Sequence, residues 1–306
     1  ESNVKEIYDA CNELSKNPEN FVLNQFSEFA NHLVHYHTTG RALEHAWEAA
    51  QGALGRPLKL AGMVSSTGSA GTIASGEYLK KKYGTKVGAL EALECPTLFN
   101  NGFGEHNIQG IGDKHLPLIH NIMNHDFVAA ISDQATDHLL MLFTTDAGRK
   151  FLSERRHVSD EVLDQLQHFG VSSICNMLGA ITMAKKMGFG PDDCIVTVAT
   201  DGSAMYKSEA EKISRRDFQE DFGPISSAIS WGRHLADVPL DACIELTHDD
   251  RERIFNLGYY TWVEQQNTPF EMFMMRKNQS FWEGLQSYVP IWDEMITDFN
   301  AKVAAG

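Results

Sequence analysis

The sequence predicts an α/β protein in which helices cover a parallel β-sheet. Short apolar runs typical of buried strands alternate along the chain with longer runs typical of helices, and such alternation favours a parallel sheet. The 306 residues are 42% hydrophobic and 10% aromatic, which is enough to build a sizeable core in one large or two modest domains.

The predicted strands and helices follow one another in the order that such a fold requires. Strands are expected at residues 58–64, 87–90, 127–131 and 195–199. Helices are expected at residues 41–54, 72–82, 136–152, 161–169 and 174–186. In the first of these helices, apolar side chains recur every three or four residues, as on the buried face of a helix: Leu43, Ala46, Trp47, Ala50 and Leu54.

Composition and charge argue against several classes of protein. A net charge of −15 repels polyphosphate backbones, so we expect no nucleic-acid partner. No apolar run approaches the roughly 20 residues that cross a bilayer, so we expect no membrane contact. The 5 cysteines are widely spaced and odd in number, which suits reduced thiols and a cytoplasmic location. The 13 histidines show no metal-ligand spacing, so we expect no metal site.

A glycine-containing loop lies between the first predicted strand and the helix that follows it. A strand that ends in small residues and feeds a helix brings backbone N–H groups together at the positive end of the helix dipole, which favours a phosphate group. The loop has neither the Lys-Ser/Thr pair of a P-loop nor the full G-x-G-x-x-G spacing. On its own it is equally consistent with a tight turn. It consists of Gly68, Ser69, Ala70, Gly71 and Thr72.

Several blocks of sequence, taken in order, resemble the fold-type-II pyridoxal-phosphate enzymes, the group of O-acetylserine sulfhydrylase (cysteine synthase) and cystathionine β-synthase. Residues 24–31 are similar to the family's Q-F-S-x-x-A-N segment, and residues 68–72 to its G-T-G-G-T phosphate loop. Residues 106–112 are close to H-K-I-Q-G-I-G. Residues 170–173 resemble its G-I-S-S block, and residues 195–206 its last strand and D-S-G-x-x-Y turn.

The resemblance implies roles for individual residues. Residues 68–72 would bind the phosphate of pyridoxal 5′-phosphate, and Ser172 would face the pyridine nitrogen. Gln25 would contact the substrate carboxylate, and Gly110 would line the site. From the residues alone, Ser172 is equally a helix cap, and Gln25 could be a surface or turn residue. Asp201 and Tyr206, which match the last block, are interpreted as mainly structural.

The lysine that forms the family's Schiff base stands in an S-x-K-x-R context, and no lysine of this chain stands in that context. In the family it precedes every block found here. We therefore expect that the N-terminal part of the family fold is missing. On this basis residues 1–40 are predicted to be a remnant of the smaller N-terminal domain, and residues 41–244 the cofactor-binding α/β domain of the tryptophan synthase β-like fold. Residues 245–306 are predicted to be a helical C-terminal extension.

Two segments depart from the family pattern. The chain between Ile131 and Gly170 is longer than in short family members and contains a predicted helix cap at Ser159. The C-terminal segment has a predicted cap at Thr247 and several tryptophans. Because aromatic side chains are costly to expose, we expect this segment to pack on the body of the protein or on a second subunit.

The resemblance implies a lyase or transferase that uses pyridoxal phosphate for β-replacement or β-elimination on a small serine- or cysteine-type amino acid. It also implies a homodimer. Two alternatives stay open at this point. One is an amino-acid dehydratase or desulfhydrase of the same fold. The other is a non-catalytic partner subunit or an inactive fragment, which the missing lysine favours.

Overall fold

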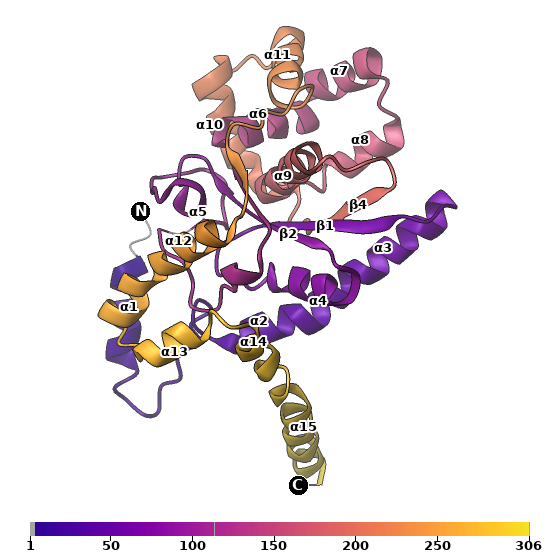
Figure 1. Ribbon diagram of the computed structural model, residues 1–306. Helices are drawn as coiled ribbons and strands as arrows, with labels where there is room; N and C mark the ends of the chain where they lie inside the picture. Colours follow the sequence, from indigo (N-terminus) through magenta and orange to yellow (C-terminus); the bar gives the residue numbers. More distant parts are fainter. Residues whose placement is uncertain (1–3, 113, 306) are drawn as a thin grey trace.

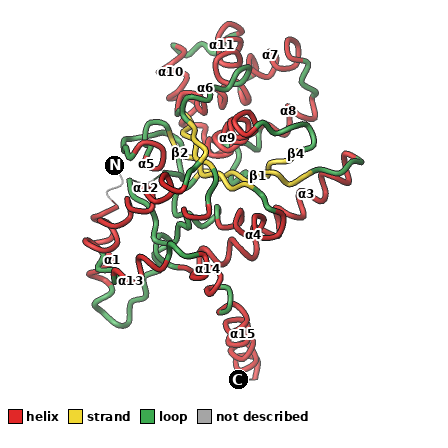
Figure 2. Tube along the Cα trace, in the orientation of Figure 1, coloured by secondary structure: helices red, strands yellow, loops and turns green. Residues whose placement is uncertain are grey.

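The computed structural model describes residues 4–112 and 114–305 of the chain. One five-stranded sheet has the strand order β4-β1-β2-β3-β5, and helices lie on both of its faces (Figure 1). Figure 2 shows that the strands occupy the centre of the molecule and that helices and loops surround them. The strands are β1 (Lys59–Ser66), β2 (Lys86–Ala92), β3 (Phe127–Ile131), β4 (Asp193–Val196) and β5 (Cys243–Glu245).

The sheet is parallel except at one edge. β1 pairs in parallel with β2 and with β4, and β2 pairs in parallel with β3, as predicted. β5, which was not predicted, pairs with β3 in the antiparallel direction, so the predicted parallel sheet has one antiparallel edge strand. This edge strand has only 3 residues, too few to produce a recognisable apolar run. The carboxyl ends of the parallel strands meet at one edge of the sheet, where ligands bind in open α/β folds.

The two faces of the sheet are covered by different helices. On one face α9 (Val171–Met187) contacts all four parallel strands. On the other face lie α3 (Gly40–Leu54) and α4 (Ala74–Tyr83). The helices above and beside α9 in Figure 1, on its side away from the sheet, are α6 (Asp133–Thr144), α7 (Asp146–Arg156), α8 (Asp160–Leu166), α10 (Lys207–Phe218) and α11 (Pro224–His234).

The helix predicted at residues 136–152 is two helices, α6 and α7. They are separated at Thr145, whose side chain accepts a hydrogen bond from the backbone N–H of Gly148 at 3.2 Å and so caps α7. The predicted cap at Ser159 is confirmed, because its hydroxyl accepts a hydrogen bond from the N–H of Val162. The predicted cap at Thr247 is also confirmed, and it forms a capping box with Asp250.

The remaining helices come from the two ends of the chain and from connections between strands. In the C-terminal segment Trp262 and Trp282 are buried, whereas Trp292 on α15 (Tyr288–Ala305) is 38% exposed. α15 projects away from the other elements in Figure 1. No helix in the described part of the chain is long and apolar enough to span a membrane. The helices are α1 (Val4–Leu14), α2 (Phe29–Val34), η1 (His35–Thr39), α5 (Thr97–Asn100), η2 (Ile122–Asn124), η3 (Ser203–Tyr206), α12 (His248–Tyr259), η4 (Tyr260–Gln265), α13 (Phe270–Met275), α14 (Gln279–Leu285) and α15 (Tyr288–Ala305).

The close packing of α9 on β2 can be tested at Gly179. A Cβ atom at this position would lie 2.2 Å from Leu90 Cδ1, so Gly179→Ala should lower the free energy of unfolding by about 1–3 kcal/mol through overpacking. Gly52→Ala on α3 is the matched control, because no atom lies within 4 Å of its added Cβ, and it should leave stability unchanged or higher. Urea unfolding of both variants measures this, and equal midpoints would contradict the packing.

Candidate functional site

The loop between β1 and α4 presents a row of backbone N–H groups. The chain is held just before it, because the N–H of Ser66 donates to Asn176 Oδ1 at 2.7 Å and the N–H of Thr67 donates to the carbonyl of Leu90 at 2.9 Å. The N–H groups of residues 68–72 have no hydrogen-bond acceptor among the residues that the structure describes. We call residues 68–72 the phosphate cradle, since unpartnered donors at the start of a helix favour an anion.

The phosphate cradle lines a cavity of about 600 Å³, and the structure brings every predicted site residue to this cavity. Gln25, Gly110 and Ser172 line it together with residues 68–72, although they are far apart in the sequence. The volume is within the usual range for a small-molecule site. The other residues that line the cavity are Phe26, Ser65, Ser66, Thr67, Ile73, Gln109, Ile111, Gly112, Asn176, Val198, Thr200, Asp201 and Tyr206.

The cradle adopts a backbone shape that few side chains tolerate. Ala70 has a φ of +66°, in the left-handed region that costs L-residues roughly 1–2 kcal/mol. A Cβ on Gly68 would lie 3.4 Å from the carbonyl oxygen of Gly110, and the N–H of Gly112 donates to the carbonyl of Thr67 at 2.7 Å. The loop at residues 106–112 is therefore packed directly against the cradle.

Asp133, at the start of α6, holds the loop at residues 106–112. Its carboxylate accepts hydrogen bonds from the N–H of Asn107 at 2.5 Å and from the N–H of Ile108 at 3.2 Å. The side chain of Asn107 also donates to Asp137 Oδ1 at 2.9 Å. Burial raises the pKa of Asp133 to about 6, and the neighbouring Glu94 carboxylate acts in the same direction. A half-buried carboxylate thus fixes one side of the cavity.

Ser172 lies at the first turn of α9. The N-cap of this helix is Gly170, so the alternative interpretation of Ser172 as the helix cap is wrong. Its hydroxyl lies 3.2 Å from Thr200 Oγ1. Among the described residues, the side chain of Ser172 is thus bonded to a hydroxyl group rather than to a charged group.

Asp201 and Tyr206 are bonded to each other. The Tyr206 hydroxyl donates to Asp201 Oδ2 at 2.7 Å, and the carbonyl of Asp201 accepts from the N–H of Gly170 at 2.9 Å. Burial and this hydrogen bond raise the pKa of Tyr206. These contacts join the turn after β4 to the start of α9, in agreement with a structural role for both residues.

Asn176 is a site residue that the sequence motifs did not reveal. Its Oδ1 accepts from the N–H of Ser66, and its Nδ2 donates to the carbonyl of Val198 at 2.8 Å. The side chain therefore joins the ends of β1 and β4 beneath the cavity. The available signal was a single asparagine within the apolar sequence of α9, because a buried amide needs hydrogen-bond partners.

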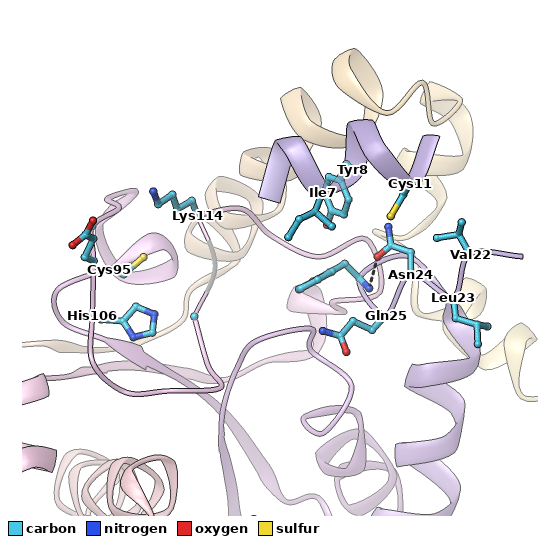
Figure 3. A pocket seen from close by; sticks show the side chains of 14 residues that line it. Ile7, Tyr8, Cys11, Val22, Leu23, Asn24, Gln25, Cys95, His106 and Lys114 are labelled. Atoms are coloured by element: carbon cyan, nitrogen blue, oxygen red, sulfur yellow. Dashed lines mark hydrogen bonds between the residues drawn. The ribbon is translucent and has the colours of Figure 1, made fainter. Parts of the chain in front are cut away.

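A second cavity, of about 720 Å³, adjoins the first and shares Gln25, Phe26 and Gly112 with it. Figure 3 shows Gln25 at one side of this second cavity and Lys114 at another. Among the described residues, no lysine lines the first cavity, and Lys114 is the lysine that lines the second. Its lining also includes two thiols and an imidazole, those of Cys11, Cys95 and His106.

Solved structures that include a cysteine synthase are similar to this chain in fold. A hydrogen sulfide-producing enzyme from Fusobacterium nucleatum is similar, with a TM-score of 0.55 and 22% sequence identity over 78% of this chain and 62% of that chain. Cysteine synthase from Entamoeba histolytica is similar with a TM-score of 0.53 and 23% identity, over 74% of this chain and 59% of that chain.

The sequence itself is similar to cysteine synthase B from Campylobacter jejuni. The two are 29% identical over 208 residues, which are 67% of this chain and 59% of the relative. No protein-family model matches the chain. The chain thus spans about three-fifths of the length of the relative that it matches.

The raised pKa of Asp133, which burial causes, predicts a pH dependence of stability. A carboxyl with an ordinary pKa of 3.8 and a folded-state pKa of about 6 binds protons more tightly in the folded protein. Unfolding free energy should therefore fall as pH rises from about 4 to 6, by about 1 kcal/mol after allowance for solvent screening. Asp133→Asn should remove this part of the slope, as measured by urea unfolding at several pH values.

Asp192→Asn is the matched control for that experiment, because the Asp192 side chain is 69% exposed. This variant should keep the wild-type slope between pH 4 and 6. If Asp133→Asn keeps the same slope as Asp192→Asn, then Asp133 does not carry the pH dependence.

Proposed function

We propose that this chain forms the cofactor-binding part of a pyridoxal-phosphate enzyme that replaces or eliminates a group at the β-carbon of a serine- or cysteine-type amino acid. The observation that carries the proposal is the row of unpartnered N–H groups at residues 68–72, at the start of α4. The sequence similarity to cysteine synthase B supports the choice of cofactor and reaction class.

The residues present fit the cofactor. The phosphate group would accept hydrogen bonds from the phosphate cradle, where the dipole of α4 favours negative charge. The cavity of about 600 Å³ extends from the cradle to Ser172, so the aromatic ring would lie between them. When bound, pyridoxal phosphate supplies an electron sink for bond cleavage at an amino acid.

Ser172 would determine the charge on the pyridine nitrogen. A hydroxyl can donate a hydrogen bond to a neutral nitrogen, whereas a carboxylate in that position would stabilise a protonated one. Asp201 also lines the cavity, but one of its carboxylate oxygens accepts a hydrogen bond from the hydroxyl of Tyr206. We propose that Ser172 keeps the ring nitrogen neutral, which suits loss of a group from the β-carbon.

Gln25 would orient the substrate. Its side chain lines both cavities, so it lies where a small amino acid bound next to the cofactor would extend. The amide N–H₂ group is a suitable donor to a carboxylate. We therefore propose that Gln25 holds the carboxylate group of the substrate.

The chain's own lysines do not supply the reactive amine in this proposal. No described lysine lines the cavity that contains the phosphate cradle, so we propose that the amine comes from polypeptide outside this chain. The same observation favours a second candidate, a partner subunit that binds the cofactor without catalysis. The two candidates differ in whether a lysine-bearing segment completes the site.

Binding of pyridoxal phosphate to the purified chain tests the phosphate cradle. Wild-type chain should bind pyridoxal phosphate in equilibrium dialysis, and inorganic phosphate should compete. Thr72→Asp places a carboxylate in the cradle and should weaken binding at least about tenfold, while an acidic group before a helix leaves folding intact. Gln134→Asp adds the same charge at the exposed first turn of α6 and should bind like wild type.

Two results would contradict this proposal. If the wild-type chain binds no pyridoxal phosphate, or if Thr72→Asp binds it as well as Gln134→Asp does, the cradle is not its binding site.

Borohydride reduction followed by peptide mapping tests which polypeptide supplies the amine. A phosphopyridoxyl adduct on one of this chain's lysines that inorganic phosphate suppresses would mean that the chain supplies its own amine.

A further inference from the structure

Asn31, on α2, connects the phosphate cradle to the turn that carries Gln25. Its Nδ2 donates to the backbone carbonyl of Gln25 at 3.0 Å and to Ser69 Oγ at 3.2 Å. A single amide group therefore bonds to the residue proposed to hold the substrate and to the loop proposed to hold the phosphate. Asn31 does not line either cavity. It therefore contacts Gln25 and Ser69 from outside the cavities.

The amide of Asn31 also fixes the path of the cradle backbone. A Cβ on Gly71 would lie 2.4 Å from Asn31 Oδ1 and 2.8 Å from Asn31 Nδ2. Only glycine at position 71 leaves room for the asparagine side chain in this arrangement. The helix that carries Asn31 is itself held in place, because His32 and Leu33 are buried.

Asn31 and Leu118 both hold the turn that carries Gln25, because Asn31 bonds to the carbonyl of Gln25 and the N–H of Leu118 donates to the carbonyl of Phe26 at 2.9 Å. Among the described residues, Asn31 is the partner that bonds to the Gln25 backbone. Within the turn, the N–H of Phe26 donates to Asn24 Oδ1 and the N–H of Ser27 donates to the carbonyl of Asn24. Displacement of Asn31 would therefore release the carbonyl of Gln25.

We propose that Asn31 is a positioning residue that couples occupancy of the phosphate cradle to the position of Gln25. This inference rests on the proposed phosphate site. An anion bound by residues 68–72 immobilises Ser69 and Gly71, these residues hold the amide of Asn31, and the amide holds the Gln25 carbonyl. A protein ordered by the first ligand loses less freedom on binding the second. The phosphate group thereby increases affinity for the substrate carboxylate, and the effect is reciprocal.

Hydrogen exchange of the whole chain with and without pyridoxal phosphate tests the coupling. In the wild-type protein, the ligand should slow exchange at residues 68–74 and also, by about tenfold, at Phe26 and Ser27. In Asn31→Ala, protection at residues 68–74 should persist while Phe26 and Ser27 exchange at the same rate with and without ligand. Asn20→Ala removes an exposed asparagine that bonds to the carbonyl of Leu14 and should behave as wild type.

A second variant distinguishes hydrogen bonding from space filling. Asn31→Asp keeps the size and shape of the side chain against Gly71 but replaces the donor Nδ2 with an acceptor, so it should also lose the protection of Phe26 and Ser27. Exchange at β1, β2 and β3 in each variant reports whether the sheet is folded. If Asn31→Ala unfolds the sheet, the comparison uses Asn31→Asp alone.

The outcomes separate the coupling from the phosphate site. Absence of protection at residues 68–74 in wild-type protein would overturn the phosphate site and the coupling together. Protection of residues 68–74 in wild type with no change at Phe26 and Ser27 would overturn only the coupling. Protection of Phe26 and Ser27 that survives in both Asn31 variants would likewise show that the signal does not pass through Asn31.

Discussion

The unpartnered backbone N–H groups of residues 68–72 are the constraint on which the site depends. Ala70 adopts a left-handed backbone conformation, which costs an L-residue roughly 1–2 kcal/mol. The native chain therefore holds this loop in a conformation that it would not adopt by itself. Such unfavourable local structure persists only where the surroundings determine it, and it is commonly found at ligand sites. An anion that accepts these hydrogen bonds would offset the cost.

Side chains from three other parts of the protein hold the loop at residues 68–72 in its conformation. Asn176 fixes the end of β1 from beneath, where it bonds to Ser66. The loop at residues 106–112 packs on one side and is held by Asp133, and Asn31 packs against Gly71 on another. Each of these contacts uses a hydrogen-bonding side chain from an element distant in the sequence. The sheet and helices thus form a frame, and polar side chains bond the loop to this frame.

The features that the sequence predicts correctly are those set by neighbouring residues or by a regular pattern of apolar residues. The limits of β3 are as predicted because its run of five apolar residues is bounded by polar ones, and Ser159 was recognised as a cap because two acidic residues follow it. The break between α6 and α7 was missed, since Thr145 interrupts the helix without a glycine or proline. Asn31 and Asn176 act through contacts between distant elements. Their roles could not be read from spacing along the chain.

The first cavity has no positively charged side chain among the described residues that line it, so binding of an anion there would depend on the positions of backbone N–H groups. Asp201 is the charged residue among the described residues that line it, and no arginine or lysine is present there to attract a phosphate. The whole chain has a net charge of −15, so the long-range field opposes an approaching anion. In the proposed site, attraction of a phosphate must come from neutral N–H groups and the α4 dipole, which act over short distances and only when correctly oriented. A small displacement of the loop would therefore remove most of the attraction. This explains why so many distant polar side chains converge on a loop of five residues.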